Sequence, residues 1–407
     1  MNSDLSLHVL LALAVVVIAG HLVGRLVSRI GQPAVIGEVL SGILLGPSLL
    51  GRIAPGAEAH LFPVEARPAL AVIAQLGVVL YMFVVGLEFD PVSLRRRATP
   101  FIITSQASIA LPFLLGCGLA VALYPEFSPP GVRLLPFALF MGIAMSITAF
   151  PVLARILTDR GLSRTELGIA ALTCAAIDDV TAWCLLAVVV GVSRATLSTA
   201  LASALLAAGF IAFIFFAARP IVARLATRED ASKEPSQAAV TWTLAGLLVS
   251  AVSAEAIGIH AIFGAFIFGA IVPAESSVAR QLRLHRTPVV TILFLPAFFA
   301  LTGLRTEIGL MASGRDWAIC GVVILLAMAG KFGGTLLAGR LVGMSWSFAA
   351  RLGVLMNTRG LMELVVLNVG LDIGVITPTL FTMMVIMAVA TTAMTAPLLD
   401  VTERASR

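Results

Sequence analysis

Two adjacent aspartates, Asp178 and Asp179, lie near the middle of an apolar stretch (residues 167–192) that is long enough to cross a membrane. A carboxylate at the centre of a bilayer costs about 2.5–3.5 kcal/mol even on the scale derived from insertion experiments. Apolar runs on both sides of the pair argue against a local loop, and packing alone does not justify two such groups. An intramembrane carboxylate pair is suited to bind protons and small cations.

Two neighbouring carboxylates repel each other when both are ionised, so the pair releases its protons in a coupled manner. Adjacent residues of a helix point about 100° apart, so one aspartate can face a cation while the other faces a cavity. Na⁺ or K⁺ requires hard oxygen ligands, which an ionised Asp179, the Thr148 hydroxyl and freed backbone carbonyls would supply. Protonation destroys this ligand set. We therefore expect Asp178, Asp179 and Thr148 to form one site for which a cation and protons compete, with Asp179 as the metal ligand.

Lys331 is the expected ion-pair partner of Asp178. It is one of two lysines in the chain and, like Arg359, it falls inside an apolar span. A buried lysine is costly unless it is paired. Arg359 and Glu363 are four residues apart, so they neutralise each other and support the surrounding segment. Lys331 is then left for the aspartates, and it can release its proton when the cation recruits Asp178. Glu38 could line a funnel or serve packing.

The composition indicates a polytopic membrane protein. Hydrophobic residues make up 59% of the 407 residues and charged residues 12%, with a mean hydropathy of +1.04; soluble domains carry about 25% charged residues. The net charge of +5 does not indicate nucleic-acid binding, because the basic residues lie in short segments between spans. The four cysteines show no metal-binding spacing, so no cofactor is expected. The first apolar run has spanning length and does not resemble a cleavable signal.

Apolar runs of about 20 residues divide the chain into thirteen candidate transmembrane helices. Nineteen basic residues follow odd-numbered spans and six follow even-numbered spans. The positive-inside rule then places the N-terminus outside and the C-terminus in the cytoplasm. We expect an integral, multi-pass protein of a bacterial inner membrane.

Three pairs of segments share a pattern in the same order along the chain: 82–94 with 298–310, 36–47 with 263–273, and 145–151 with 355–361. Each pair is separated by seven spans, so the two halves face opposite ways through the membrane. The sequence predicts one domain over residues 1–407, with repeat one at about 5–192, a connector helix at about 196–225 and repeat two at about 238–400. Inverted six-helix repeats are typical of secondary transporters, whose sites are built from broken helices.

Broken helices are predicted at equivalent positions in the two halves. Polar side chains with a proline or glycine interrupt both spans at mid-membrane depth: Ser146, Thr148 and Pro151 in the first, and Asn357, Thr358 and Gly360 in the second. Backbone groups without partners are prohibitive in lipid, so such segments persist where they cross each other or line a polar cavity. We expect the two interruptions to cross.

Three segments, IDDVTAW (177–183), GQPAVIGEVLSGILLGPSLLG (31–51) and MNTRGLMELVVLNVGL (356–371), resemble the monovalent cation:proton antiporter-2 family. Its members include bacterial Na⁺/H⁺ antiporters, Kef-type K⁺/H⁺ systems and plant cation/H⁺ exchangers. The resemblance implies a homodimer in the bilayer whose core moves as an elevator, exchanging Na⁺ (or K⁺, Li⁺) for H⁺. It places Asp179 at the position of the transport aspartate, Asp178 at the adjacent acid of electrogenic members and Lys331 at the lysine that pairs with it. Glu363 falls where such members also carry an acid.

The double aspartate favours electrogenic Na⁺/H⁺ antiport serving pH and salt homeostasis, whereas the sequence of residues 356–371 leaves electroneutral K⁺/H⁺ exchange open. A cation channel is a more remote alternative, because no filter-like carbonyl motif is present. An enzyme is not expected. Intramembrane aspartyl proteolysis needs its two carboxylates on facing helices, and adjacent residues of one helix do not converge in that way.

Overall fold

Every regular element that the structure describes is a helix. The structure is a computed structural model, and it describes residues 3–88, 98–194, 197–229, 236–258, 260–283 and 289–404. Within these residues, eleven helices are long and apolar enough to cross a membrane, and two shorter apolar helices span Ala261–Ile271 and Trp346–Met356. The expected all-α membrane fold is confirmed. The count of thirteen spans, the inverted repeats and their boundaries stay predictions.

The contacts between residues divide the chain into two units. The first comprises Met1–Val17, Val64–Arg95 and Ala187–Phe298, and the second Ile18–Pro63, Arg96–Leu186 and Phe299–Arg407. Helices α1 (Ser3–Arg29), α10 (Glu166–Arg194) and α17 (Leu295–Leu304) contribute residues to both units. Some of the basic residues that set the predicted orientation, such as those at positions 95–97, lie outside the described residues, and the orientation stays a prediction.

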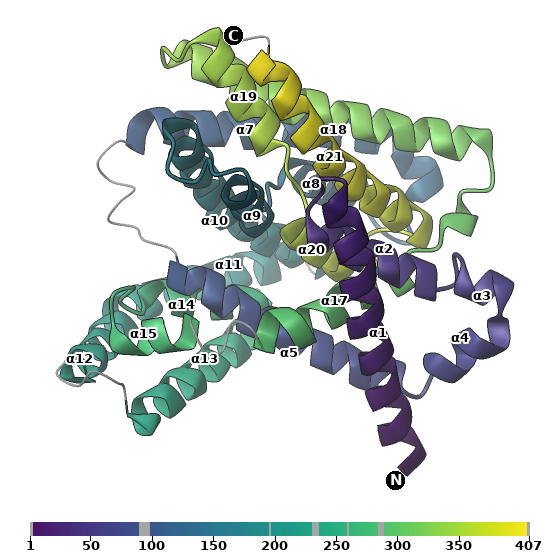
Figure 1. The fold of residues 1–407 in the computed structure, drawn as a ribbon. Helices are drawn as coiled ribbons and strands as arrows, with labels where there is room; N and C mark the ends of the chain where they lie inside the picture. Colours follow the sequence, from purple (N-terminus) through teal and green to yellow (C-terminus); the bar gives the residue numbers. More distant parts are fainter. Residues whose placement is uncertain are drawn as a thin grey trace. The chain divides into compact units, whose positions relative to one another are not determined.

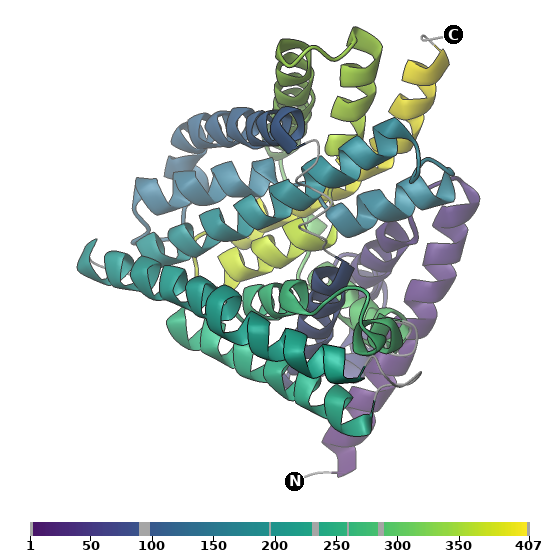
Figure 2. The ribbon, with the colours of Figure 1, turned by 90° about the vertical axis from the view of Figure 1, so that its left-hand side faces the viewer.

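The first unit is built from long helices that pack through glycines. Its elements are α5 (Arg67–Glu88), α11 (Leu197–Phe213), the π-helical η2 (Ile214–Ala218), α12 (Arg219–Glu229), α13 (Gln237–Ile257), α14 (Ala261–Ile271), α15 (Ser277–Gln281) and the π-helical η4 (Val290–Phe294). Helices α11 and α13 are neighbours (Figure 2). Gly86 of α5 and Gly269 of α14 touch, and a side chain at either would meet the backbone of the other helix. The glycine pattern of 263–273 therefore serves close packing.

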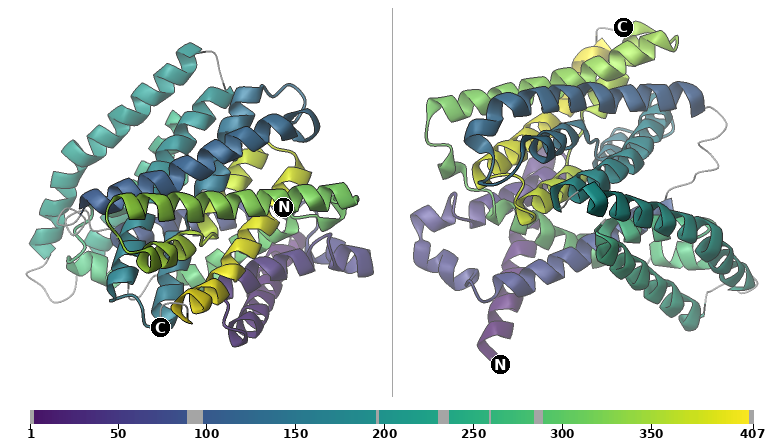
Figure 3. Two further views of the ribbon diagram at one scale, coloured as in Figure 1. Left: turned by 90° about the horizontal axis from the view of Figure 1, so that it is seen from above. Right: turned by 180° about the vertical axis from the view of Figure 1, so that it is seen from behind.

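The second unit holds all of the predicted site residues. Its elements are α2 (Ala34–Leu45), α3 (Leu50–Ile53), α4 (Pro55–Leu61), α7 (Ala98–Phe127), α8 (Leu134–Ser146), α9 (Phe150–Asp159), most of α10, the end of α17, the 3₁₀ turn η5 (Ile308–Leu310), α18 (Gly314–Leu341), α19 (Trp346–Met356), α20 (Leu361–Asp372) and α21 (Pro378–Arg404). Helices α7 and α18 run side by side (Figures 1 and 3). Gly330 and Gly334 of α18 lie against Pro112 and Ala107 of α7, so the two backbones approach closely and bring Lys331 to α7.

Two spans of this unit are interrupted where the sequence predicts. Helix α8 ends at Ser146 and α9 begins at Phe150, so Pro151 falls in the first turn of α9, where its missing N–H costs no hydrogen bond. Helix α19 ends at Met356 and α20 begins at Leu361. Between them Gly360 has φ 154°, a conformation that side chains with a Cβ rarely adopt. Local sequence therefore fixes the position of both breaks.

Candidate ion and proton site

Asp178 and Lys331 form an ion pair in the interior of the second unit. Lys331 Nζ lies 2.7 Å from Asp178 Oδ2, and the two side chains are 0% and 1% exposed. The pair joins α10 to α18 through two residues that are 153 positions apart in sequence. A buried charge without a partner is strongly destabilising, so each residue accounts for the presence of the other.

Three hydroxyl groups also donate to the Asp178 carboxylate. Ser105 Oγ lies 2.5 Å from Oδ1, while Ser108 Oγ and Thr148 Oγ1 lie 3.0 and 2.9 Å from Oδ2. With Lys331, both oxygens of Asp178 are fully hydrogen-bonded. The sequence prediction identified Thr148 and missed the serines. The signal that could have found them is the polar run TSQAS (104–108) inside an otherwise apolar stretch.

Asp179 has a different environment although it is the next residue of the same helix. Its side chain is 2% exposed, and within the described part of the chain neither carboxylate oxygen makes a hydrogen bond of normal geometry. The backbone N–H of Phe150, at the start of α9, also interacts with this carboxylate. Buried acceptors without donors are rare and call for an explanation. A carboxylate that takes up a proton or a cation provides one.

The two interruptions cross and bond to each other through the backbone. The N–H of Ala149 donates to the carbonyl of Thr358 at 2.9 Å, and the Thr148 hydroxyl lies 2.9 Å from the carbonyl of Met356. The Thr358 hydroxyl instead donates to Leu355 O, in the last turn of α19, at 2.7 Å. The Thr148 side chain therefore reaches the backbone of the second break, whereas Thr358 takes part through its carbonyl group. These bonds satisfy carbonyls that the helix ends leave open.

The remaining polar residues of the breaks make local contacts or none that meet normal geometry. The Ser146 hydroxyl donates to Ile143 O at 2.9 Å, which keeps it within α8. Asn357 is 3% exposed, and its Oδ1 is a buried acceptor without a hydrogen bond in the described region. Glu38 of α2 also has one buried oxygen, Oε2, without a hydrogen bond there. Among the described residues, no hydrogen bond or ion pair joins Glu38 to the aspartates, and its role stays open.

Arg359 does more than neutralise Glu363. The predicted pair is formed at 3.2 Å between fully buried side chains, and the guanidinium also donates to Ala144 O at 3.0 Å and to Met145 O at 2.5 Å. These carbonyls lie in the last turn of α8, where a cation is favoured by the helix dipole. Arg359 thus closes the end of the other broken helix.

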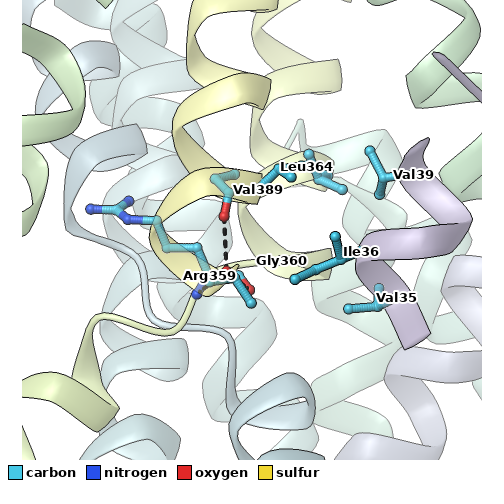
Figure 4. Close-up of a pocket in the computed structure, with 9 residues that line it drawn as sticks. Val35, Ile36, Val39, Arg359, Gly360, Leu364 and Val389 are labelled. Carbon is cyan, nitrogen blue, oxygen red and sulfur yellow. Dashed lines mark hydrogen bonds between the residues drawn. The ribbon is translucent and has the colours of Figure 1, made fainter. Parts of the chain in front are cut away.

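The backbone around Arg359 is held from α21 and lies beside a small pocket. Thr392 Oγ1 accepts from Arg359 N at 2.9 Å and lies 2.7 Å from Arg359 O. Apolar residues of α2, among them Ile36 and Val39, line the pocket together with Gly360. Figure 4 shows the Arg359 side chain directed away from these residues. Thr392 is not among the predicted site residues, because a threonine in a Met-rich run has no distinctive local signal.

Comparison with known proteins identifies the family of this chain and supports its fold. The model of the family described as "Sodium/hydrogen exchanger, transmembrane" matches residues 11–401. The chain is 43% identical to "Na(+)/H(+) antiporter NhaS4" of Synechocystis sp., over 98% of both chains. It is 35% identical to "K(+)/H(+) antiporter 1" of Saccharomyces cerevisiae over 91% of its own length, but it spans 43% of that longer protein.

The structure of the sodium proton antiporter MjNhaP1 from Methanocaldococcus jannaschii superposes with a TM-score of 0.66 at 15% identity, over 96% of both chains. The chain thus has the fold of a sodium/proton antiporter, which is a multi-pass membrane protein. The buried charges of the second unit belong to this fold. The chain belongs to the transmembrane sodium/hydrogen exchanger family, as the sequence resemblance predicted. The relatives named here are antiporters rather than enzymes.

Proposed function

We propose that this protein is a secondary active antiporter that exchanges Na⁺ for H⁺ at Asp178 and Asp179 by alternating access. The observation that carries the proposal is the contrast between the two carboxylates. Asp178 is saturated with donors, including Lys331, whereas Asp179 is buried with oxygens that have no hydrogen bond of normal geometry in the described region. Asp179 is therefore the group that binds either the cation or a proton.

Lys331 supplies the second proton of the cycle. While Asp178 holds the ammonium group at 2.7 Å, the pair has no net charge. When a cation draws Asp178 towards Asp179, Lys331 loses its counter-ion and releases its proton. One cation is then exchanged for two protons, one from Asp179 and one from Lys331, and the cycle moves net charge across the membrane. The antiport is electrogenic on this count.

Na⁺ is the proposed cation, and K⁺ in an electroneutral exchange is the alternative. The full-length similarity to a protein named as an Na⁺/H⁺ antiporter supports Na⁺, while the similarity to one named as a K⁺/H⁺ antiporter favours the alternative. No step requires a cofactor. We further propose the architecture that the sequence predicts: thirteen spans in two inverted repeats, assembled as a homodimer in a bacterial inner membrane with the N-terminus outside.

The direct test is purified protein in liposomes that contain a pH dye, titrated separately with Na⁺, K⁺ and Li⁺. Asp179→Asn should abolish cation-driven proton movement while the protein still folds and inserts, because the amide neither ionises nor binds a proton. Asp400→Asn is the matched control, since Asp400 pairs with Arg160 and its side chain is 51% exposed. Exchange near the wild-type rate in Asp179→Asn would refute the assignment.

The electrogenic step is tested by the ion pair. Lys331→Ala leaves Asp178 buried without its counter-ion, which typically costs about 3–5 kcal/mol of stability. Adding Asp178→Asn should recover part of that loss and leave exchange of one cation for one proton. With a K⁺ diffusion potential set by valinomycin, Na⁺/H⁺ exchange should respond to voltage in the wild type and not in the double variant. Voltage-insensitive exchange by the wild type would leave the pair a structural contact.

A further inference from the structure

Gln32 and Pro397 both act on one backbone carbonyl, that of Ala393, and the proposed function assigns neither residue a role. Pro397 stands inside α21, where it has no N–H to donate to the Ala393 carbonyl one turn earlier. The side-chain amide of Gln32, in the link between α1 and α2, donates to that carbonyl at 3.0 Å. Gln32 therefore supplies the hydrogen bond that the proline removes from α21.

We propose that Gln32 is a positioning residue for the exchange: its bond to Ala393 holds α21 against α2 in one of the two arrangements that alternating access requires. The inference rests on the proposed function and deepens it, because it names a contact that sets the balance between these arrangements. Pro397 is the second part of the contact, since it keeps the Ala393 carbonyl open to a donor from outside α21.

The position of Ala393 links this bond to the ion site. Its neighbour Thr392 binds both backbone groups of Arg359, the N–H at 2.9 Å and the carbonyl at 2.7 Å. Arg359 lies in the second break, so a displacement of α21 at this level is passed to the crossing of the two breaks. Among the described residues, Gln32 forms no hydrogen bond or ion pair with the aspartates. It acts on the site through α21 rather than as a ligand.

The helix that follows Gln32 is fixed to α1 and α17 by backbone contacts. A side chain at Gly37 would meet the backbone of Gly24 in α1, and a side chain at Gly42 would meet the backbone of Ala300 in α17. Backbones packed this closely leave α2 little room to move relative to these two helices. The amide that binds α21 is therefore anchored to α1, α2 and α17.

The face of α2 towards the second break makes a different kind of contact. Val35, Ile36 and Val39 line the small pocket there, opposite Gly360 (Figure 4). Apolar attraction has no preferred direction, so these side chains favour contact without fixing one register of α2 along α21. A hydrogen bond is directional, and the bond from Gln32 forms in one register. The bond therefore selects among arrangements that apolar contact does not distinguish.

A polar link between α17 and α20 lacks this selectivity. Arg305, directly after α17, pairs with Asp372 at the end of α20 at 2.8 Å, and the side chains are 37% and 59% exposed. Water replaces the contacts of such a pair when it separates. The Ala393 carbonyl instead belongs to a helix of spanning length, and Gln32 Oε1 is already a buried acceptor without a hydrogen bond among the described residues. Separating Gln32 from Ala393 leaves a carbonyl without a donor in apolar surroundings, which is costly.

The test measures the apparent KM for Na⁺ at each face of the membrane, in right-side-out and in everted vesicles. Gln32→Met removes the donor and keeps the length of the side chain. It should shift the balance between the two arrangements by about fivefold, the equilibrium effect of one hydrogen bond. Because the two arrangements expose the site to opposite faces, the apparent KM should rise at one face and fall at the other.

Pro397→Ala makes the test specific for the Ala393 carbonyl. It returns an N–H that satisfies this carbonyl in both arrangements, so the balance should shift in the same direction as in Gln32→Met. Adding Gln32→Met to Pro397→Ala should then change neither KM by more than about twofold, the limit for sites that act independently of the bond. Gln106→Met is the matched control, since Gln106 is exposed on α7 and bonds Thr181; both KM values should stay at the wild-type level.

Unchanged KM values at both faces in Gln32→Met would overturn the proposal. Changes in the same direction at both faces would also overturn it, because they would report cation binding or general damage rather than a shift between arrangements. Full addition of the two effects in the double variant would show that Gln32 does not act through the Ala393 carbonyl. If Gln32→Met does not insert, Pro397→Ala alone should still show opposite changes at the two faces. Wild-type vesicles without Na⁺-driven proton movement would refute the proposed function itself, whereas wild-type exchange with no opposite changes refutes only the role of Gln32.

Discussion

Both broken helices are interrupted near the middle of a span, but one break contains neutral residues and the other contains charged ones. The break between α8 and α9 contains the neutral residues Ile147, Thr148 and Ala149, whereas the break between α19 and α20 contains Arg359, with Glu363 one turn further on. The charged break caps the helix that precedes the neutral one, since Arg359 donates to carbonyls in the last turn of α8. The neutral break in turn presents Thr148 to Asp178. One break supports the structure and the other serves the ion site.

This division of roles explains how a permanent positive charge can lie close to a cation site. Arg359 is fully buried, yet the two terminal nitrogens of its guanidinium donate to a carboxylate and two carbonyls. A guanidinium with matched acceptors in a rigid fork is well suited to this task. The comparison of the two breaks can be tested by substitutions on each side, starting with the largest expected loss of stability.

Arg359→Ala should destabilise the protein by about 3–5 kcal/mol, because it leaves Glu363 as a buried charge and exposes the end of α8. Thermal unfolding of the purified protein in detergent measures the loss. Arg160→Ala is the control, since the Arg160–Asp400 pair is partly exposed and such pairs contribute about 0–1 kcal/mol. Equal losses in the two variants would show that Arg359 does not hold the breaks together.

Gly360→Ala should cost about 1–3 kcal/mol, the usual scale of a strained backbone conformation. The residue has φ 154°, and an added Cβ would meet the side chain of Val152. Gly321→Ala serves as the matched control, because Gly321 lies within α18 and an added Cβ there meets nothing within 4 Å. The unfolding temperature should therefore fall in Gly360→Ala and should not fall in Gly321→Ala. Similar unfolding temperatures in the two variants would show that Gly360 has no special role.

Thr392→Val should cost about 1–3 kcal/mol, because the buried N–H of Arg359 loses its acceptor. Thr395→Val is the control, since its hydroxyl donates only within α21, to Thr391 O at 3.2 Å. Hydrogen exchange of the Arg359 amide gives a local measurement in addition to thermal stability. Equal protection of that amide in both variants would argue against support from α21.

Thr148→Ala and Thr358→Ala should each cost about 1 kcal/mol, the usual contribution of one hydrogen bond. Their effects on transport should differ, because the Thr148 hydroxyl lies beside Asp178, whereas the Thr358 hydroxyl donates to Leu355 O at the end of α19. The apparent KM for the cation should rise in Thr148→Ala and stay near the wild-type value in Thr358→Ala. Unchanged kinetics and stability in both variants would place the ion site elsewhere.

The sequence reveals features that depend on local composition, and it conceals those that depend on which helices meet. Asp178, Lys331 and the two breaks could be predicted because polar groups in apolar spans are costly and therefore few. Ser105 and Thr392 could not be assigned, because a hydroxyl group can also form its hydrogen bond within its own helix. The carbonyl contacts of Arg359 were also missed, because they join residues more than 200 positions apart in sequence.

The Thr148 hydroxyl carries a single proton but has two acceptors at 2.9 Å. While Asp178 is ionised, the proton is divided between the carboxylate and the Met356 carbonyl. A proton placed on Asp178 Oδ2 reverses the first bond, so that Thr148 accepts from Asp178 and gives its own proton entirely to Met356. The carbonyl at the end of α19 thus changes its availability with the charge of a residue on α10. The Thr148 hydroxyl thus couples the protonation state of Asp178 to the hydrogen bonding of the second break.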